Sequence, residues 1–132
     1  MTGTTGDDRF TVVIMTRDRR HELLRTLERM TALPERPRII VADNGSTDGT
    51  VDAVLSRFPE VSLWRSAKNL GAAARNAAVR RVGSPYVAFC DDDTWWEPGA
   101  LSAAADVLDV HDGLASVTGR VVVEPGSTDD PI

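Results

Sequence analysis

Three adjacent carboxylates, Asp91, Asp92 and Asp93, directly follow the apolar run PYVAFC. Carboxylates this close repel one another, so the group costs stability unless a cation or hydrogen-bond donors compensate. Mg²⁺ and Mn²⁺ prefer oxygen ligands, and Mg²⁺ is commonly held by one or two carboxylates together with substrate phosphates and water. The pattern therefore predicts a divalent metal site that receives a diphosphate. The alternative is an acidic loop that is merely solvated and caps the next helix.

A second polar cluster, ADNGSTDGT at residues 42–50, is rich in turn-forming residues. Asp43 lies at the end of an apolar run, where its carboxylate could accept a hydrogen bond from the ring N–H of uracil or thymine. An ordinary loop between a strand and a helix is an equal alternative. Arg75, four residues after Gly71, is either a phosphate ligand or a surface arginine, and the local sequence leaves this choice open.

Strand-like and helix-like spacings of apolar residues alternate along the chain. The polar clusters follow directly after predicted strands. Such alternation predicts an α/β fold, with a mostly parallel sheet, helices on both faces and right-handed crossovers. Ligands of such sheets bind beyond the carboxyl ends of the strands. We therefore expect the polar groups at 16–18, 43–45 and 91–93 to meet at one edge. Strands are expected at residues 10–15, 37–43, 61–64, 85–90 and 114–123, and helices around residues 23–30, 51–58, 70–82 and 97–110.

Length and composition limit the class of protein. A chain of 132 residues has room for one domain, which we place at residues 10–123, between a flexible leader at 1–9 and a polar tail at 124–132. The net charge of −5 argues against a nucleic-acid partner, and no apolar run approaches the ~18 residues of a membrane span. The lone Cys90 is expected in the core and fits a reducing, cytoplasmic location.

Four segments together resemble the family-2 glycosyltransferases, which are nucleotide-sugar enzymes of the GT-A fold. They are FTVVIMTRDR, VADNGSTDGT, NLGAAARN and YVAFCDDDTWWEPGAL, and the resemblance extends from about Phe10 to Val123. It implies a Rossmann-like nucleotide-binding half, a nucleoside-diphosphate sugar as donor, an acceptor, and Mg²⁺ or Mn²⁺ as cofactor. The expected reaction is sugar transfer to an unknown acceptor with inversion at the anomeric carbon.

The resemblance also implies roles for individual residues. Many relatives carry an aromatic residue where this chain has Arg17, so a guanidinium plane would pack against the base here. Where relatives often have Asn, this chain has Asp18, to which we assign no role. The expected nucleoside contacts are Thr16, Arg17 and Asp43; the donor-side arginine is Arg75; Asp91 and Asp92 face the ribose or the metal's water; and Asp93, with Asp91, binds the metal.

Relatives usually continue for another hundred residues or more, and that part supplies the acceptor site and the catalytic base. Neither His21 nor His111 is a demonstrable substitute, so the catalytic base is unknown and we expect a donor-binding portion. The alternative function is a nucleotide-sugar-binding module that transfers nothing. A half-domain that lacks its cover would expose apolar surface, which predicts self-association into a homo-oligomer.

Two other enzyme classes fit the sequence poorly. An aspartate-nucleophile phosphatase would need a threonine at the position of Trp95. A nicotinamide dehydrogenase would need glycines in the loop TRDRR, where pyrophosphate approaches the backbone. Trp95 and Trp96 suggest stacking on a sugar, but the favoured interpretation is structural: one packs beneath the next helix and the other anchors the loop.

Overall fold

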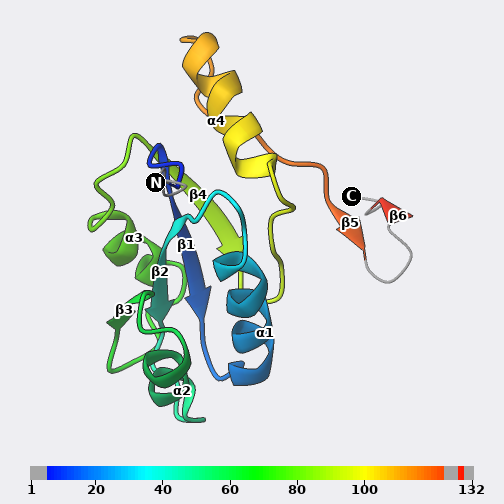
Figure 1. Ribbon diagram of the computed structural model, residues 1–132. Coiled ribbons are helices and arrows are strands. Elements are labelled where there is room, and N and C mark those ends of the chain that lie inside the picture. Colours follow the sequence, from blue (N-terminus) through cyan, green and yellow to red (C-terminus); the bar gives the residue numbers. More distant parts are fainter. Residues whose placement is uncertain (1–5, 124–127, 130–132) are drawn as a thin grey trace, which may run out of the picture.

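Four parallel strands form the central sheet of the computed structural model, which describes residues 6–123 and 128–129 (Figure 1). The sheet order is β3-β2-β1-β4. In the register, Thr16 lies beside Asp43 and Met15 lies beside Asp91, so the carboxyl ends of β1, β2 and β4 meet at one edge, as expected. The strands are β1 (Phe10–Thr16), β2 (Arg38–Asp43), β3 (Ser62–Arg65) and β4 (Tyr86–Asp91).

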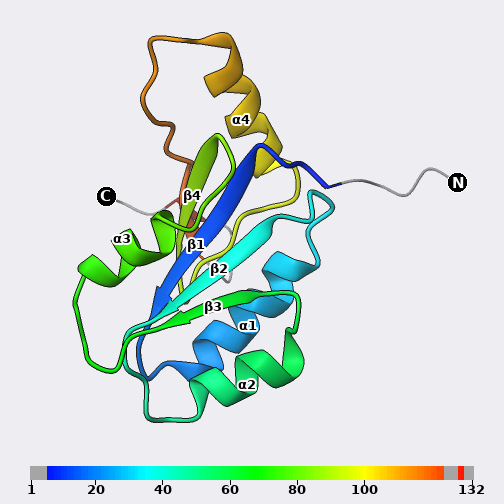
Figure 2. The ribbon, with the colours of Figure 1, turned by 90° about the vertical axis from the view of Figure 1, so that its left-hand side faces the viewer.

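Helices cover both faces of this sheet (Figure 2), which confirms the predicted α/β class. Side chains alternate between faces along β1, because successive residues of a strand point to opposite sides. Val12 and Ile14 pack in a core with α1, α2 and α4, whereas Val13 packs with α3 on the other face. No helix in the described ranges is long and apolar enough to span a bilayer. The helices are α1 (Arg20–Thr31), α2 (Thr50–Arg57), α3 (Ala73–Val79) and α4 (Ala100–Val110).

The prediction of a fifth strand at residues 114–123 is wrong for most of that segment. Only β5 (Val122–Val123) is a strand, and it pairs antiparallel with β6 (Thr128–Asp129) in a separate two-stranded sheet. Residues 114–121 pair with no strand of the described chain. A strand needs backbone hydrogen bonds to a neighbour, so the apolar residues of this segment are not sufficient to form one. Much of the expected polar tail, 124–127 and 130–132, lies outside the described residues.

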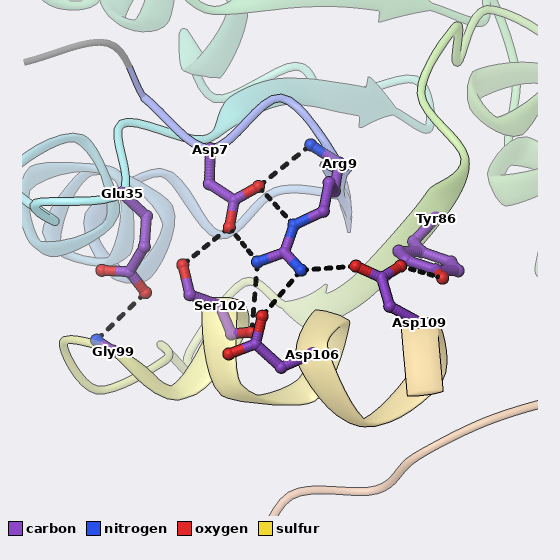
Figure 3. Close-up of polar contacts among 8 residues, drawn as sticks. All are labelled: Asp7, Arg9, Glu35, Tyr86, Gly99, Ser102, Asp106 and Asp109. Carbon is purple, nitrogen blue, oxygen red and sulfur yellow. Dashed lines mark hydrogen bonds and ion pairs between the residues drawn. The ribbon is translucent and has the colours of Figure 1, made fainter. Parts of the chain in front are cut away.

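The expected flexible leader is only partly within the described chain, because residues 1–5 lie outside it. The backbone N–H of Asp7 donates to the carbonyl of Glu35 over 2.8 Å. The guanidinium of Arg9 forms ion pairs of 2.7 Å with Asp7, Asp106 and Asp109 (Figure 3). These contacts fasten α4 to the start of β1, so residues 7 and 9 are packed rather than free.

The connection from β4 to α4 runs back along α1 and is fixed at successive points to this helix and to the loop that follows it. Thr26 Oγ1 donates to the carbonyl of Asp92 over 2.8 Å, the N–H of Trp96 lies 3.4 Å from the sulfur of Met30, and the N–H of Gly99 donates to Glu35 over 3.0 Å. This segment therefore holds the acidic residues in a defined position.

The tryptophans of this connection belong to the packing of the molecule. Trp95 and Trp96 are half-buried and pack against the main core. The guanidinium of Arg29 lies 4.3 Å from the ring centroid of Trp95, which is a cation–π distance. These contacts support the packing interpretation over sugar stacking.

Candidate functional site

A pocket of about 300 Å³ opens at the carboxyl edge of the sheet, where β1 and β4 end. It gathers five of the predicted site residues and adds three others. The predicted residues of its lining are Thr16, Arg17, Asp91, Asp92 and Asp93, and the added ones are Met15, Arg19 and Asn44.

Asp92 is the buried member of the acidic trio, with only 8% of its surface exposed. Its Oδ2 accepts a hydrogen bond from Thr16 Oγ1 over 2.9 Å, and its Oδ1 accepts one from Arg19 Nε over 2.9 Å. Burial raises the pKa of Asp92, while Thr16 and Arg19 act in the opposite direction. Both carboxylate oxygens are thus engaged within the protein.

Two arginines offset the charge of the trio. Arg19 Nη2 lies 3.0 Å from Asp93 Oδ2, and Arg75 Nη2 lies 3.6 Å from Asp91 Oδ1. Cationic side chains of the chain itself therefore supply part of the compensation that the crowded carboxylates need. Sequence reasoning missed Arg19, which is one of four arginines within residues 17–25 and whose partners lie more than 70 positions away.

Asp43 lies beside the pocket but is not part of its lining. It is fully buried, and its Oδ2 accepts the backbone N–H of Ser46 over 3.1 Å. Its Oδ1 has no hydrogen-bond partner among the described residues. An unpartnered buried acceptor costs free energy, so this oxygen has an unused capacity to accept a hydrogen bond.

The loop after β2 is tied to the segment that precedes α3. The side-chain amide of Asn44 donates to Asn69 Oδ1 over 2.8 Å and to the carbonyl of Gly71 over 3.1 Å, and its oxygen accepts from the N–H of Leu70 over 2.7 Å. Arg75, on α3, lies outside the pocket lining but reaches Asp91. The structure thereby brings Arg75 to the rim of the site.

The carboxylates fit a divalent metal that is completed by a ligand. Nowhere in the described ranges do three or more His, Cys, Asp or Glu side chains converge on one point as a metal cage. Two trio carboxylates face outward, since the Asp91 and Asp93 side chains are 70% and 49% exposed. One or two carboxylates together with phosphate and water oxygens form the usual shell of Mg²⁺, so this donor set matches a metal that arrives with a diphosphate.

Neither the cysteine nor the two histidines line the pocket. Cys90 is buried, and burial raises its pKa to about 11. His111 Nδ1 lies 3.0 Å from the carbonyl oxygen of Val107, just after the end of α4. The catalytic base thus stays unassigned.

The family model described as "Glycosyl transferase family 2" matches residues 11–131. The chain is 33% identical over 108 residues to N-acetylglucosaminyl-diphospho-decaprenol L-rhamnosyltransferase of Mycobacterium tuberculosis, with 72% of this chain and 35% of that protein covered. It is 36% identical over 96 residues to validoxylamine A glucosyltransferase of Streptomyces hygroscopicus subsp. limoneus, with 70% and 20% covered.

Solved structures agree with the sequence matches. The mannosyltransferase PcManGT from Pyrobaculum calidifontis, in complex with GDP-Man and Mn²⁺, superposes with a TM-score of 0.64 at 26% identity, with 80% of this chain and 33% of that chain covered. Residues 1–349 of S. aureus TarS, in complex with UDP, give a TM-score of 0.64 at 25% identity, with 88% and 38% covered.

The chain spans about a third of the length of these relatives, apart from the validoxylamine A glucosyltransferase, of which it covers a fifth. The family model nevertheless matches nearly the whole of it, and the sheet has the architecture of the superposed enzymes. This chain belongs to glycosyl transferase family 2.

Proposed function

We propose that the pocket binds the nucleoside diphosphate of a nucleotide sugar together with Mg²⁺ or Mn²⁺. The observation that carries the proposal is the grouping of Thr16, Arg17 and the acidic trio around one cavity at the carboxyl edge of the sheet. This edge is where ligands of open α/β sheets bind. The complexes of PcManGT with GDP-Man and Mn²⁺ and of TarS with UDP support the same ligand class.

The metal would be held by Asp93, with Asp91 as the second carboxylate. When bound, such an ion offsets charge that grows on the leaving diphosphate, a Lewis-acid role. Asp92 serves mainly to hold the loop, because Thr16 and Arg19 occupy its two oxygens; in a complex it would lie beneath the ribose or the metal's water.

The protein's own groups would orient the rest of the donor. Asp43 Oδ1, buried and without a partner in the described chain, would accept a ring N–H of the base. Arg17 is exposed at the pocket wall, where its guanidinium plane can pack against the base. Arg75 would donate to the diphosphate, since its guanidinium already lies beside Asp91.

The whole protein would then transfer the sugar to an acceptor hydroxyl, with inversion at the anomeric carbon. A nucleotide-sugar-binding module without transfer is the second candidate, because the chain covers only 33–38% of the superposed enzymes and no catalytic base is evident among the described residues. Incubation of the purified chain with UDP-GlcNAc and with GDP-Man separates the two. Hydrolysis or transfer supports the enzyme, whereas metal-dependent binding without turnover supports the module.

Calorimetric titration tests the donor site itself. UDP, GDP and dTDP are each titrated with and without Mn²⁺ into the parent protein, Asp93→Asn and the control Asp52→Asn. Asp52 is on α2, away from the pocket lining, so its substitution removes the same charge at a distance from the site. We expect binding that requires Mn²⁺ in the parent and control and is lost in Asp93→Asn; equal affinity in all conditions for the preferred nucleotide would overturn the metal proposal.

Self-association and a cytoplasmic location are also part of the proposal. Exposed large apolar side chains include Phe89 at 51%, Leu114 at 47% and Val110 at 76%, and burial of such surface between copies would be favourable. Light scattering at rising concentration tests this point, and a monomer at the highest concentration would contradict it.

A further inference from the structure

We propose that Arg19 is the internal counter-ion of the site: its guanidinium holds Asp93 while the pocket is empty, and it releases that carboxylate when the metal binds with a diphosphate. The inference rests on the proposed donor site. It adds a residue that couples the metal to the nucleotide.

The geometry places one guanidinium on two carboxylates of the trio. Arg19 Nε lies 2.9 Å from Asp92 Oδ1, and Nη2 lies 3.0 Å from Asp93 Oδ2. These two bonds differ in their surroundings, since the Asp92 side chain is 11% exposed and that of Asp93 is 49% exposed. The bond to Asp92 is the sheltered anchor, and the bond to Asp93 is open to water and to competing ions.

A metal at Asp93 would compete with Arg19 for the same carboxylate. A divalent ion and a guanidinium within a few ångströms of each other repel, so the two cannot share Asp93 without cost. Arg19 can give up Asp93 without leaving the site, because its Nε remains bonded to the buried Asp92. The donors released from Asp93 are then available to a phosphate oxygen, which a guanidinium binds well.

This exchange predicts cooperation between the two ligands. Metal alone must displace Arg19 from Asp93 with no new partner for the guanidinium, so it binds weakly. A diphosphate that enters with the metal supplies that partner. Coupling between binding sites is reciprocal and commonly amounts to about 5- to 150-fold in affinity, so the same residue should weaken metal alone and strengthen metal with nucleotide.

The test measures Mn²⁺ binding by electron paramagnetic resonance of the free ion, first with Mn²⁺ alone. The variants are Arg19→Gln, Arg19→Lys and the control Arg20→Gln. Arg20 is the next residue and makes no ion pair with the trio in the described chain, so its substitution reports the effect of net charge alone. We expect Mn²⁺ alone to bind about tenfold more tightly to Arg19→Gln and within about twofold of the parent to Arg20→Gln.

The second step repeats the measurement with UDP, GDP or dTDP present. The gain in Mn²⁺ affinity that the nucleotide causes should fall at least about fivefold in Arg19→Gln. Arg19→Lys keeps the charge, so Mn²⁺ alone should bind as in the parent, but a lysine lacks the two-donor edge that spans both aspartates, so the nucleotide effect should again fall. If Arg19→Gln does not fold, the nucleotide effect measured in Arg19→Lys still tests the proposal.

Each outcome decides the role of Arg19. Tighter binding of Mn²⁺ alone to Arg19→Gln but not to Arg20→Gln supports the counter-ion. Equal Mn²⁺ affinity of the parent and Arg19→Gln, including no binding by either, overturns it, as does an unchanged nucleotide effect in Arg19→Lys. Failure of the donor site itself looks different: then none of the three nucleotides changes the Mn²⁺ affinity of the parent.

Discussion

Thr16 Oγ1 donates a hydrogen bond of 2.9 Å to Oδ2 of Asp92, which joins the end of β1 to the loop after β4. Both residues are almost fully buried, at 2% and 8% exposure. Together with the bond from Arg19, this contact fixes the middle of the acidic trio. Its flanking members, Asp91 and Asp93, remain exposed at the pocket.

Replacement of Thr16 by Val keeps the shape of the side chain but removes the donor to Asp92. A buried carboxylate that loses a hydrogen bond costs about 1–3 kcal/mol, so the free energy of unfolding should fall by that amount in urea titrations. Thr47→Val is the control, because Thr47 is exposed and surface changes of this kind stay within about 0.5 kcal/mol. Equal stability of the two variants would show that the Thr16 contact does not hold the loop.

Gly45 has a backbone conformation that the loop after β2 requires. Its φ is +84°, and an added Cβ would lie 3.1 Å from the carbonyl carbon of Lys68. Gly45→Ala should therefore lower the free energy of unfolding by about 1–2 kcal/mol, from left-handed backbone strain and the close contact. Gly83 has no neighbour within 4 Å and no positive φ, so Gly83→Ala is the matched control and should change stability by less than about 0.5 kcal/mol. A similar loss in both variants would argue against a left-handed turn at Gly45.

The Arg9 cluster predicts a specific acid sensitivity (Figure 3). The hydrogen bond from Arg9 holds the pKa of Asp7 well below its ordinary value of 3.8. The pKa of Asp109 is lowered as well, chiefly by the hydroxyl of Tyr86 and then by Arg9. A carboxyl whose pKa is lowered by folding contributes stability above its unfolded pKa, and this contribution is lost as the pH falls below 3.8.

The parent should therefore lose more stability than Arg9→Met when the pH falls from about 5 to about 2. Urea midpoints of the two proteins measured across this pH range check the prediction. The difference in stability between the parent and Arg9→Met should be largest at about pH 5 and should shrink toward about pH 2. Arg57→Met removes the same charge from an exposed position without an ion pair in the described chain, and it should follow the pH dependence of the parent. A parent and an Arg9→Met protein that differ by a constant amount at every pH would rule out the cluster as the source.

Cys90 should be unreactive in the folded protein. Burial raises the pKa of its thiol to about 11, so the reactive thiolate is scarce near neutral pH. We expect slow modification by a disulfide reagent under native conditions at about pH 8 and rapid modification in guanidinium chloride. Rapid modification of the native protein would indicate that the end of β4 opens. Cys90→Ala should retain nucleotide binding, which would exclude the thiol from the site.

The sequence predicted the sheet well, together with the meeting of several polar loop residues at its carboxyl edge, because strand pattern and polar loop residues are local signals. Apolar runs with polar residues at their ends defined β1, β2 and β4 within one or two residues, and parallel pairing then brought Thr16 and the acidic trio to one edge. The run at 114–123 gave the same kind of signal but failed, since a strand also needs a partner that composition does not reveal.

The residues that sequence analysis did not identify make their contacts with positions far away along the chain. Arg19 meets Asp92 and Asp93 across more than 70 residues, and nothing in TRDRR distinguishes it from its neighbours. The same holds for Arg9, whose partners on α4 lie 97 and 100 positions away. Long-range ion pairs of this kind are fixed by the fold and cannot be read from local spacing.

Anomalous scattering from Mn²⁺, in crystals grown with the preferred nucleoside diphosphate, is the decisive test of the proposed metal site. If Asp93 holds the metal, an anomalous peak lies within coordination distance of its carboxylate, with diphosphate oxygens on the same ion and the base next to Asp43. A peak and a nucleotide located elsewhere, with Asp93 still paired to Arg19 and facing water, would refute the assignment.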